Sequence, residues 1–210
     1  MKLLVATTNP GKLREIRGLL AHAPVELVSL ADIPSIPEPE ETGRTFEDNA
    51  RLKALYYAEH AQLPTVAEDS GLVVDALDGE PGVQSARFLG PAATYPERFH
   101  EIYRRLAARS DAPRTARFVC ALAFVRDGGV AFETTMTVEG EIAATPSGTA
   151  GFGYDPIFYF PPYGTTLADV DQEAKLRVAH RGKAFRAFAD WLAEHGRGES
   201  TSMMDGPKGA

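Results

Sequence analysis

The sequence predicts a mixed α/β fold, and three observations favour this class. Short apolar runs at residues 2–6 and 25–30 alternate with segments whose apolar residues recur at helical spacing. Two alternating apolar segments flank Asp127-Gly128-Gly129, which is the strongest hairpin signal in the chain. The 210 residues are 44% hydrophobic and 24% charged, as is usual in globular proteins. No repeat and no break in composition demands an independent second domain.

The first half of the chain begins with two predicted strands separated by a helix. Residues 2–6 predict a strand, the turn formers at 7–11 predict a loop, and Leu13, Ile16 and Leu19 share one face of a helix. Residues 25–30 predict a second strand, and the prolines and glutamates of 31–44 predict a long acidic loop. Thr45 resembles an N-cap, and Phe46 begins the apolar face of the next helix. A short buried strand at 64–67 is then expected to end in the polar segment 68–71.

The second half adds a strand at 72–77, a turn-rich loop at 78–82 and a helix capped by Thr94. The hairpin strands are expected at 115–125 and 130–138. A glycine-rich loop at 148–153 precedes a last amphipathic helix from about 171 to 194. Residues 196–210 are small and polar and predict a disordered tail, so residues 1–195 are expected to form one folded domain.

Composition excludes several classes of function. The chain has 22 Lys and Arg against 29 Asp and Glu, a formal net charge of −7, which argues against binding to a nucleic-acid backbone. No apolar run approaches the roughly 18 residues that span a bilayer. Cys120 is the only cysteine and cannot form an intrachain disulfide, which fits a reducing compartment. We expect a soluble cytoplasmic protein without a nucleic-acid or membrane partner.

The loop between the first strand and helix could hold a small anion. Helix N-termini attract phosphate, and a lysine there adds a positive charge. An ordinary capped turn explains the same residues equally well. The residues concerned are Thr7, Thr8, Asn9, Pro10, Gly11 and Lys12.

Carboxylates follow the predicted strand at 64–67 and occur in the acidic loop. Glu68 and Asp69 would lie at the end of the strand, where open α/β sheets bind ligands, and Glu41 lies in the loop. Such carboxylates can hold Mg²⁺ or deprotonate a water molecule. Adjacent acids are common, however, and a solvated acidic turn is the more frequent explanation of any one pair.

Three further groups of residues allow both a functional and a purely structural explanation. Asn49 and Lys53 lie four apart on one helix face, which by itself favours a solvated flank. Gly151 to Pro156 could form a stacking platform for a base, or a loop with one buried aromatic residue. A histidine and cations on the last helix could bind keto oxygens or phosphates, or only face solvent. That last group is Lys175, His180, Arg181 and Lys183.

The order of these motifs is familiar. The segments are 6–12, Glu41-Thr42-Gly43, Asn49-Ala50 with Lys53-Ala54, Asp69-Ser70-Gly71-Leu72, Ser85-Ala86-Arg87-Phe88, Gly151-Phe152-Gly153-Tyr154-Asp155-Pro156 and His180-Arg181-Gly182. Together they resemble the inosine/xanthosine triphosphate pyrophosphatases over residues 1 to about 195. The resemblance implies Mg²⁺-dependent hydrolysis of ITP, dITP and XTP to the monophosphate and pyrophosphate. It also implies an elongated mixed β-sheet flanked by helices in two lobes, a substrate cleft between the lobes, and a homodimer.

The resemblance also implies roles for individual residues. Asp69 would be the general base, and Glu41 and Asp69 would bind the metal. The loop from Thr7 to Lys12 and the side chain of Lys53 would hold the triphosphate, and Ser70 would line the substrate site. The purine would contact Phe152, Gly153, Tyr154, Asp155, Lys175, His180 and Arg181. Three positions depart from the usual family pattern, namely Asp48, Glu68 and Ala179.

Three alternative functions remain open, and one of them is an interaction module that uses the acidic loop from Ala31 to Glu41. A Maf-type nucleotide pyrophosphatase shares a related architecture but would need a first loop rich in serine and arginine. A nucleotide-binding sensor without catalysis would need no general base, and the chain has Asp69 together with Glu41 and Lys12.

Overall fold

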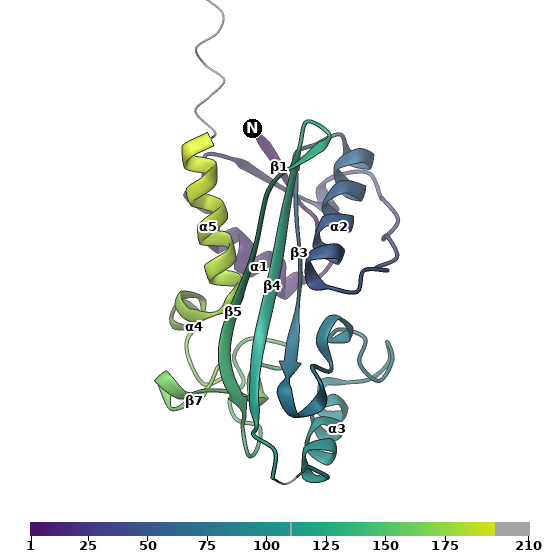
Figure 1. Cartoon of the computed structure of the whole chain (residues 1–210). Helices are drawn as coiled ribbons and strands as arrows, with labels where there is room; N and C mark the ends of the chain where they lie inside the picture. Colours follow the sequence, from purple (N-terminus) through teal and green to yellow (C-terminus); the bar gives the residue numbers. More distant parts are fainter. Residues whose placement is uncertain (110, 196–210) are drawn as a thin grey trace, which may run out of the picture.

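The protein is built on one long, mixed β-sheet, described here from a computed structural model for residues 1–109 and 111–195. The sheet has seven strands in the order β2-β1-β3-β4-β5-β6-β7, and only the β1–β2 and β1–β3 pairs are parallel. The strands are β1 (Lys2–Val5), β2 (Glu26–Ser29), β3 (Thr65–Val74), β4 (Thr115–Arg126), β5 (Gly129–Ile142), β6 (Phe158–Phe160) and β7 (Thr165–Thr166). The predicted α/β class and the elongated mixed sheet are confirmed (Figure 1).

Helices cover both faces of this sheet (Figure 1). They are α1 (Pro10–Leu19), α2 (Phe46–Ala61), α3 (Tyr95–Ala107), α4 (Gln172–Val178) and α5 (His180–His195). Helices α1 and α5 pack on one face, where Val66 and Cys120 join a cluster with Phe185. Helix α2 packs on the other face, against Ala67 and Ala121. Side chains along a strand alternate between the two faces of the sheet, so neighbouring residues of β3 contribute to the core on opposite faces.

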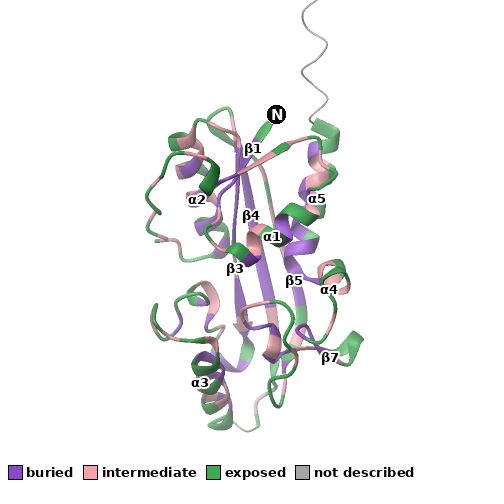
Figure 2. Cartoon of the chain, turned by 180° about the vertical axis from the view of Figure 1, so that it is seen from behind, coloured by how far each residue is buried: buried purple, intermediate pink, exposed green. Residues whose placement is uncertain are grey.

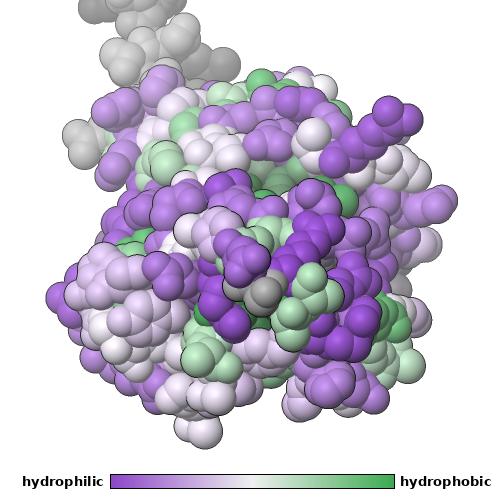
Figure 3. All heavy atoms as spheres, turned by 60° about the horizontal axis from the view of Figure 1, so that its bottom comes forward, coloured by the Kyte–Doolittle hydropathy of each residue, from purple (hydrophilic) through white to green (hydrophobic). Residues whose placement is uncertain are grey.

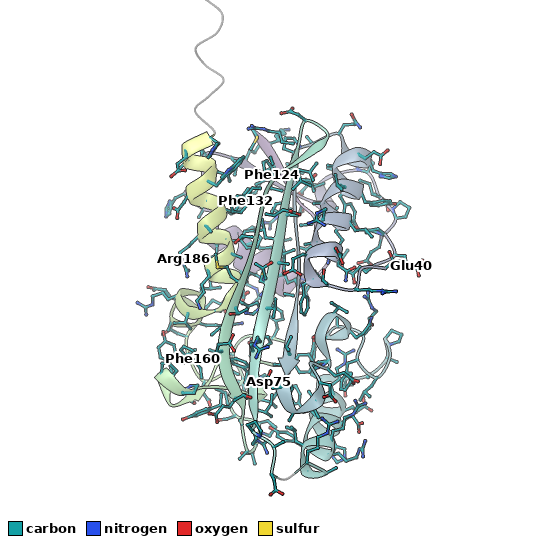
Figure 4. The ribbon with its side chains drawn as sticks, viewed as in Figure 1. Glu40, Asp75, Phe124, Phe132, Phe160 and Arg186 are labelled. Atoms are coloured by element: carbon teal, nitrogen blue, oxygen red, sulfur yellow. The ribbon has the colours of Figure 1, made fainter. Side chains whose placement is uncertain are left out.

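A separate apolar cluster fills the half of the molecule that contains α3 and β6. Phe160 and Asp75 mark that half in Figure 4, whereas Phe124 and Phe132 lie beside α5 in the other half. Figure 2 shows the buried residues continuing along the central strands between the two halves. On the end of the molecule seen in Figure 3, hydrophobic residues form small patches among hydrophilic ones.

Strand β3 is longer than the sequence predicts. Each of its residues pairs with β4, but only Thr65 and Val66 pair with β1. The side of β3 that faces away from β4 is therefore free of a neighbouring strand beyond Val66. The expectation of two strands at 64–67 and 72–77, separated by a polar segment at 68–71, is wrong, because the polar residues continue a single strand that ends at Val74. Their charges are accommodated by partners on both faces of the sheet.

The remaining predicted elements are mostly confirmed. The hairpin turns at Asp127 and Gly128, both with positive φ (54° and 76°), between the paired residues Arg126 and Gly129. The expected helix over 171–194 is interrupted at Ala179, whose extended ψ of 151° separates α4 from α5. Strands β6 and β7 are too short to be predicted from alternation. No helix within the described residues is long and apolar enough to cross a membrane. The predicted tail at 196–210 lies outside the described residues.

Candidate active site

A cleft of about 230 Å³ opens where β3 loses its neighbour β1. Its lining includes residues from every motif singled out in the sequence. Of the predicted site residues, only Pro10 and Gly11 do not line it. Those that do are Thr7, Thr8, Asn9, Lys12, Glu41, Lys53, Asp69, Ser70, Phe152, Gly153, Tyr154, Asp155, Lys175, His180 and Arg181.

On the α2 face of β3, two carboxylates share one ammonium group. The Nζ atom of Lys53 lies 2.7 Å from Glu41 Oε1 and 3.0 Å from Asp69 Oδ1. Asn49 donates to Asp69 Oδ2 over 3.3 Å and accepts from the Gly43 N–H over 2.8 Å, so it ties the acidic loop to the strand. Both Asn49 and Lys53 are buried. The sequence-based preference for a solvated helix flank is therefore wrong, because this flank packs on the polar segment of β3.

The ionisation of this carboxylate cluster follows from burial and charge. Burial raises the pKa of Asp69 above its usual value despite the neighbouring Lys53 ammonium. Burial alone would also raise the pKa of Glu41, but Lys53 and Arg87 outweigh it and lower that pKa. Asp69 is thus the more basic of the two carboxylates.

On the opposite face, a second cluster joins α1, α4 and α5. Glu15 lies 2.9 Å from Lys175 Nζ and 2.6 Å from Arg181 Nη1. Arg181 also contacts Glu68 Oε1 at 3.0 Å and donates to Ser70 Oγ over 2.9 Å. These side chains are buried, apart from the partly buried Ser70. The break at Ala179 sets α5 at the angle that brings Arg181 against β3.

Glu68 brings a second residue of α1, Lys12, into this cluster. Lys12 Nζ lies 3.1 Å from Glu68 Oε1, and the Cys120 thiol donates to Glu68 Oε2 over 3.5 Å. Burial would raise the pKa of Glu68, but Arg181 and Lys12 outweigh it and hold the pKa far below its usual range. Three cations and three carboxylates therefore balance each other on this face, namely Lys12, Lys175, Arg181, Glu15, Glu68 and Asp155.

The aromatic residues of the 151–156 loop complete this face. The ring of Phe152 lies 4.9 Å from Lys175 Nζ and 5.4 Å from Arg181 Cζ. Asp155 Oδ2 accepts from Lys175 Nζ over 2.6 Å and from the Phe152 N–H over 2.8 Å, which fixes the loop. Tyr154 is buried, and its hydroxyl donates to the Ser85 carbonyl over 2.8 Å. Its hydroxyl is thus committed to holding the loop, while its side chain still lines the cleft.

His180 stacks on Phe118 with ring centroids 4.9 Å apart, and it is 5% exposed. Burial and the neighbouring Arg181 charge lower its pKa well below the usual value, so the imidazole is neutral at pH 7. Within the described residues its Nδ1 atom has no hydrogen-bond partner. A buried polar atom of this kind normally finds one in a ligand or water.

The 7–12 loop is already capped. Asn9 Oδ1 accepts from the Gly11 and Lys12 N–H groups over 2.9 and 3.1 Å, and Thr7 Oγ1 accepts from the Asn9 N–H over 3.2 Å. Pro10 has no N–H to offer. A phosphate would therefore contact the side chains of this loop and the Lys12 ammonium. The N–H groups of Gly11 and Lys12 at the helix N-terminus already donate to Asn9, so they are not free to bind it. Gly11 admits the Phe152 ring, whose Cδ1 would lie 2.9 Å from an added Cβ.

The site suits a hard divalent cation only in combination with a substrate. The ammonium of Lys53 holds the two carboxylates of Glu41 and Asp69 around one positive charge. Among the described residues no group of three or more His, Cys, Asp or Glu is placed to enclose a metal ion. Mg²⁺ commonly takes one or two carboxylates and completes its shell with water and substrate phosphates. Glu41 and Asp69 fit that pattern, whereas Glu40 of the same loop is exposed at the outer edge (Figure 4).

Sequence reasoning gave no role to two members of these clusters, Glu15 and Arg87. Glu15 carries no motif and differs from its helix neighbours only in being an acid beside the apolar position Ile16. Arg87 was noted only as part of a match. Glu68 was named as a possible metal ligand or base, and the structure instead pairs it with Arg181 and Lys12. A polar residue at a buried helix position is the signal that could have found Glu15.

Comparisons with known proteins agree with this architecture. The model of the Ham1 family matches residues 3–191. A protein of Exiguobacterium sp. named dITP/XTP pyrophosphatase is 46% identical over 89% of this chain and 94% of its own length. One of the same name from Geobacter sulfurreducens is 45% identical over 93% of this chain and 98% of its own.

Solved structures are similar as well. A HAM1 protein from Coxiella burnetii is 38% identical, with a TM-score of 0.86 over 92% of this chain and 99% of that one. A nucleoside-triphosphatase / dITP/XTP pyrophosphatase from Mycobacterium abscessus is 44% identical, with a TM-score of 0.70 over 91% and 99%. With the match of the family model to nearly all of the described residues, these likenesses show that the chain belongs to the Ham1 family.

Proposed function

We propose that this protein hydrolyses non-standard purine nucleoside triphosphates, of the dITP, XTP and ITP type, to the monophosphate and pyrophosphate. One observation carries the proposal. Two clusters lie on opposite faces of β3 at its free edge. One holds Arg181 against the ring of Phe152, and the other holds Lys53 against the Asp69 carboxylate. A nucleotide lying across this edge would place its base in the first cluster and its phosphates in the second. Relatives named dITP/XTP pyrophosphatase support the choice of substrate.

The proposed base subsite selects a keto oxygen. Phe152 offers a ring for stacking, and the neighbouring Lys175 and Arg181 have only N–H donors. Hypoxanthine and xanthine present an acceptor oxygen at position 6, whereas adenine presents an amino group there, which cannot accept a hydrogen bond from these N–H groups. A hydrogen-bond mismatch of this kind can discriminate by about four to five orders of magnitude.

In the proposed reaction, Asp69 accepts the proton of a water molecule that attacks the α-phosphorus. Burial raises its pKa, which makes it a better base than an exposed carboxylate. Asn49 and Lys53 fix its two oxygens from the α2 side. Ser70 would position the sugar or α-phosphate end of the substrate, because it lies between Asp69 and Arg181.

We infer that Mg²⁺ is the cofactor and that Glu41 and Asp69 hold it. When bound, the ion would neutralise phosphate charge and polarise the reacting phosphorus–oxygen bonds. The charge balance of the cleft supports this need. Lys53 and Arg87 are matched by Glu41 and Asp69, so these four residues leave no net positive charge for a triphosphate.

The family resemblance further supports a homodimer, and the single cysteine fits the cytosol. Light scattering coupled to size-exclusion chromatography measures the oligomeric state directly, and a monomer at assay concentration would contradict the proposed homodimer.

The decisive experiment is a panel of ITP, XTP, dITP, ATP and GTP with Mg²⁺, in which pyrophosphate and orthophosphate are measured separately. We expect pyrophosphate from ITP, XTP and dITP, little product from ATP or GTP, and loss of turnover with EDTA. Guanine also has an oxygen at position 6, so the keto-selecting donors account for the low rate with ATP, whereas a low rate with GTP depends on its 2-amino group. Orthophosphate as first product would contradict the proposal, and a preference for other nucleotides would favour a Maf-type enzyme. Tight binding without turnover would favour a sensor.

The variant Asp69→Asn tests the proposed base within the same panel. It keeps the shape of the side chain but cannot take the proton, so turnover of ITP should fall by at least about 100-fold. Calorimetry should show that inosine monophosphate binds nearly as before. Turnover close to that of the unmodified protein would remove Asp69 from this role.

A further inference from the structure

Arg87 reaches from one half of the molecule to the proposed metal ligand of the other. It follows the short helical turn η3 (Gly82–Gln84), and its Nη2 atom lies 2.6 Å from Glu41 Oε2. The other oxygen of Glu41 contacts Lys53 at 2.7 Å. A single carboxylate thus carries two cations, one from α2 and one from the segment that faces it across the cleft.

Side chains from three other parts of the chain hold the backbone around Arg87. The Ser85 hydroxyl donates to the Gly82 carbonyl over 2.6 Å and accepts from the Leu72 N–H over 2.9 Å, on the free edge of β3. Buried Arg98 donates to the Phe88 carbonyl over 3.0 Å. The Tyr154 hydroxyl bond to Ser85 adds a third tie. A surface ion pair contributes little to stability and needs no such support, so the anchoring points to a guanidinium that must be placed accurately.

The partner of Arg87 distinguishes it from other arginines on the surface. Arg104 pairs with Glu101 within α3, and Arg117 pairs with Asp75, and these carboxylates do not line the cleft. Glu41 does line it. If Glu41 binds Mg²⁺, the cation repels the guanidinium that now occupies its second oxygen. Arg87 must then exchange its partner when the substrate arrives.

The phosphates are the partner that the substrate supplies. Arg181 of the base subsite contacts Ser70, and Asp69, the chain neighbour of Ser70, contacts Lys53. Lys53 in turn contacts Glu41, which is the partner of Arg87. Arg87 therefore lies beyond Asp69 from the base subsite, where the β- and γ-phosphates would be. A guanidinium matches phosphate oxygens with two parallel hydrogen bonds, and the Arg87 side chain is 44% exposed.

We propose that Arg87 is a catalytic residue that leaves Glu41 on substrate binding and holds the departing pyrophosphate. This inference rests on the proposed function. A water oxygen bonds to the α-phosphorus, the bond from that phosphorus to the oxygen bridging the β-phosphate breaks, and the electron pair leaves on pyrophosphate. Asp69 takes the water proton. Arg87 stabilises the negative charge that develops on the leaving group.

The test compares Arg87→Ala and Arg87→Lys with the control Arg104→Ala. We expect Arg87→Ala to lower kcat for ITP about 100-fold, as does loss of other groups that stabilise transition-state charge. Arg87→Lys should recover part of the rate, because lysine keeps the charge but not the paired donors. Arg104→Ala should match the unmodified protein, and thermal melting should confirm that all variants are folded.

A binding measurement separates this role from a merely structural one. With Mg²⁺ present, Arg87→Ala should bind inorganic pyrophosphate about tenfold more weakly and inosine monophosphate unchanged, because only pyrophosphate reaches Arg87. Unchanged pyrophosphate binding, or equal losses for both ligands, would overturn the inference. If the unmodified protein releases no pyrophosphate from ITP, the proposed function fails, and the two binding measurements still decide the role of Arg87.

Discussion

Glu15 is a buried carboxylate whose charge holds two cations in place. Removing one partner of a buried ion pair costs about 3 kcal/mol or more, because the other partner stays buried. We expect Glu15→Gln to lower the free energy of unfolding by about 3 kcal/mol at pH 7. Urea denaturation measures this difference. The control is Glu26→Gln, since Glu26 pairs with Lys2 at 3.8 Å on the exposed surface and should contribute less than about 1 kcal/mol.

The pH dependence of this difference has a definite sign. Burial would raise the pKa of Glu15, but Arg181 and Lys175 outweigh it and lower the pKa below the ordinary value of 4.5. A lowered pKa in the folded state stabilises the protein above the unfolded-state pKa, and the stabilisation is lost as the pH falls through the folded-state pKa. The gap between Glu15→Gln and the unmodified protein should therefore narrow below about pH 4.5. A gap that widens in acid would contradict the assigned charge.

The sequence predicted the location of some residues in the structure and not of others. The resemblance brought Asp69, Lys53 and Arg181 together, although they are far apart in the chain, and the structure places all three in one cleft. Asn49 was wrongly assigned to a solvated flank and Glu15 was not singled out, because a polar side chain on a helix is normally solvated. Their burial depends on partners contributed by other elements, which a pattern within one helix does not contain.

At the scale of the elements, Gly71 is the position in β3 against which the segment that carries Arg87 packs. A Cβ added at Gly71 would lie 2.3 Å from Ser85 Oγ and 2.6 Å from the Gly82 carbonyl oxygen. We expect Gly71→Ala to push this segment away, lowering the free energy of unfolding by about 1–3 kcal/mol and lowering turnover of ITP. Urea denaturation and steady-state kinetics check both effects.

Gly18→Ala is the matched control, because Gly18 lies in exposed helix and nothing lies within 4 Å of an added Cβ. There the substitution should raise stability by about 0.5–1 kcal/mol and leave turnover unchanged. If Gly71→Ala were as stable and active as Gly18→Ala, the contact between β3 and the Ser85 segment would contribute neither to stability nor to turnover.

The elements were predictable where local signals were complete. The hairpin was found because Asp-Gly favours the positive φ angles of its turn and the flanking strands alternate. Strand β3 was cut short because charged residues normally mark the end of a buried strand. The last helix was predicted as one because Ala179 is a good helix former. At the break, Gly182 of α5 approaches the Leu176 carbonyl of α4 too closely for a side chain, and this contact is not visible in the helical pattern.

At the scale of the whole molecule, β4 connects the apolar clusters of both halves. Ala116 and Phe118 belong to the cluster around α3, whereas Leu122 and Phe124 belong to the cluster beneath α5. A rigid strand shared by two clusters couples their stability. We therefore predict that residues 1–195 unfold as one cooperative unit.

The single tryptophan makes this test direct. Trp191 lies in the α5 half, 5.6 Å from Phe124 between ring centroids. Its fluorescence reports on that half, while far-UV circular dichroism reports on all helices, including α3. We expect coincident urea transitions by both measurements. Two separated transitions would mean that the halves are independent domains.

The alternation along β3 also limits how the length of the chain can change. Glu68 and Ser70 face Arg181, whereas Asp69 between them faces Lys53. Deleting or inserting one residue ahead of this segment would exchange the two sides, unless the whole pairing with β4 slipped as well. Asp69, the proposed base, would then lie among the cations of the proposed purine subsite, and Glu68 and Ser70 would lie on the side proposed for the phosphates. A side-chain substitution here changes one contact, but a single-residue insertion or deletion would move every side chain of the segment to the opposite face of the sheet.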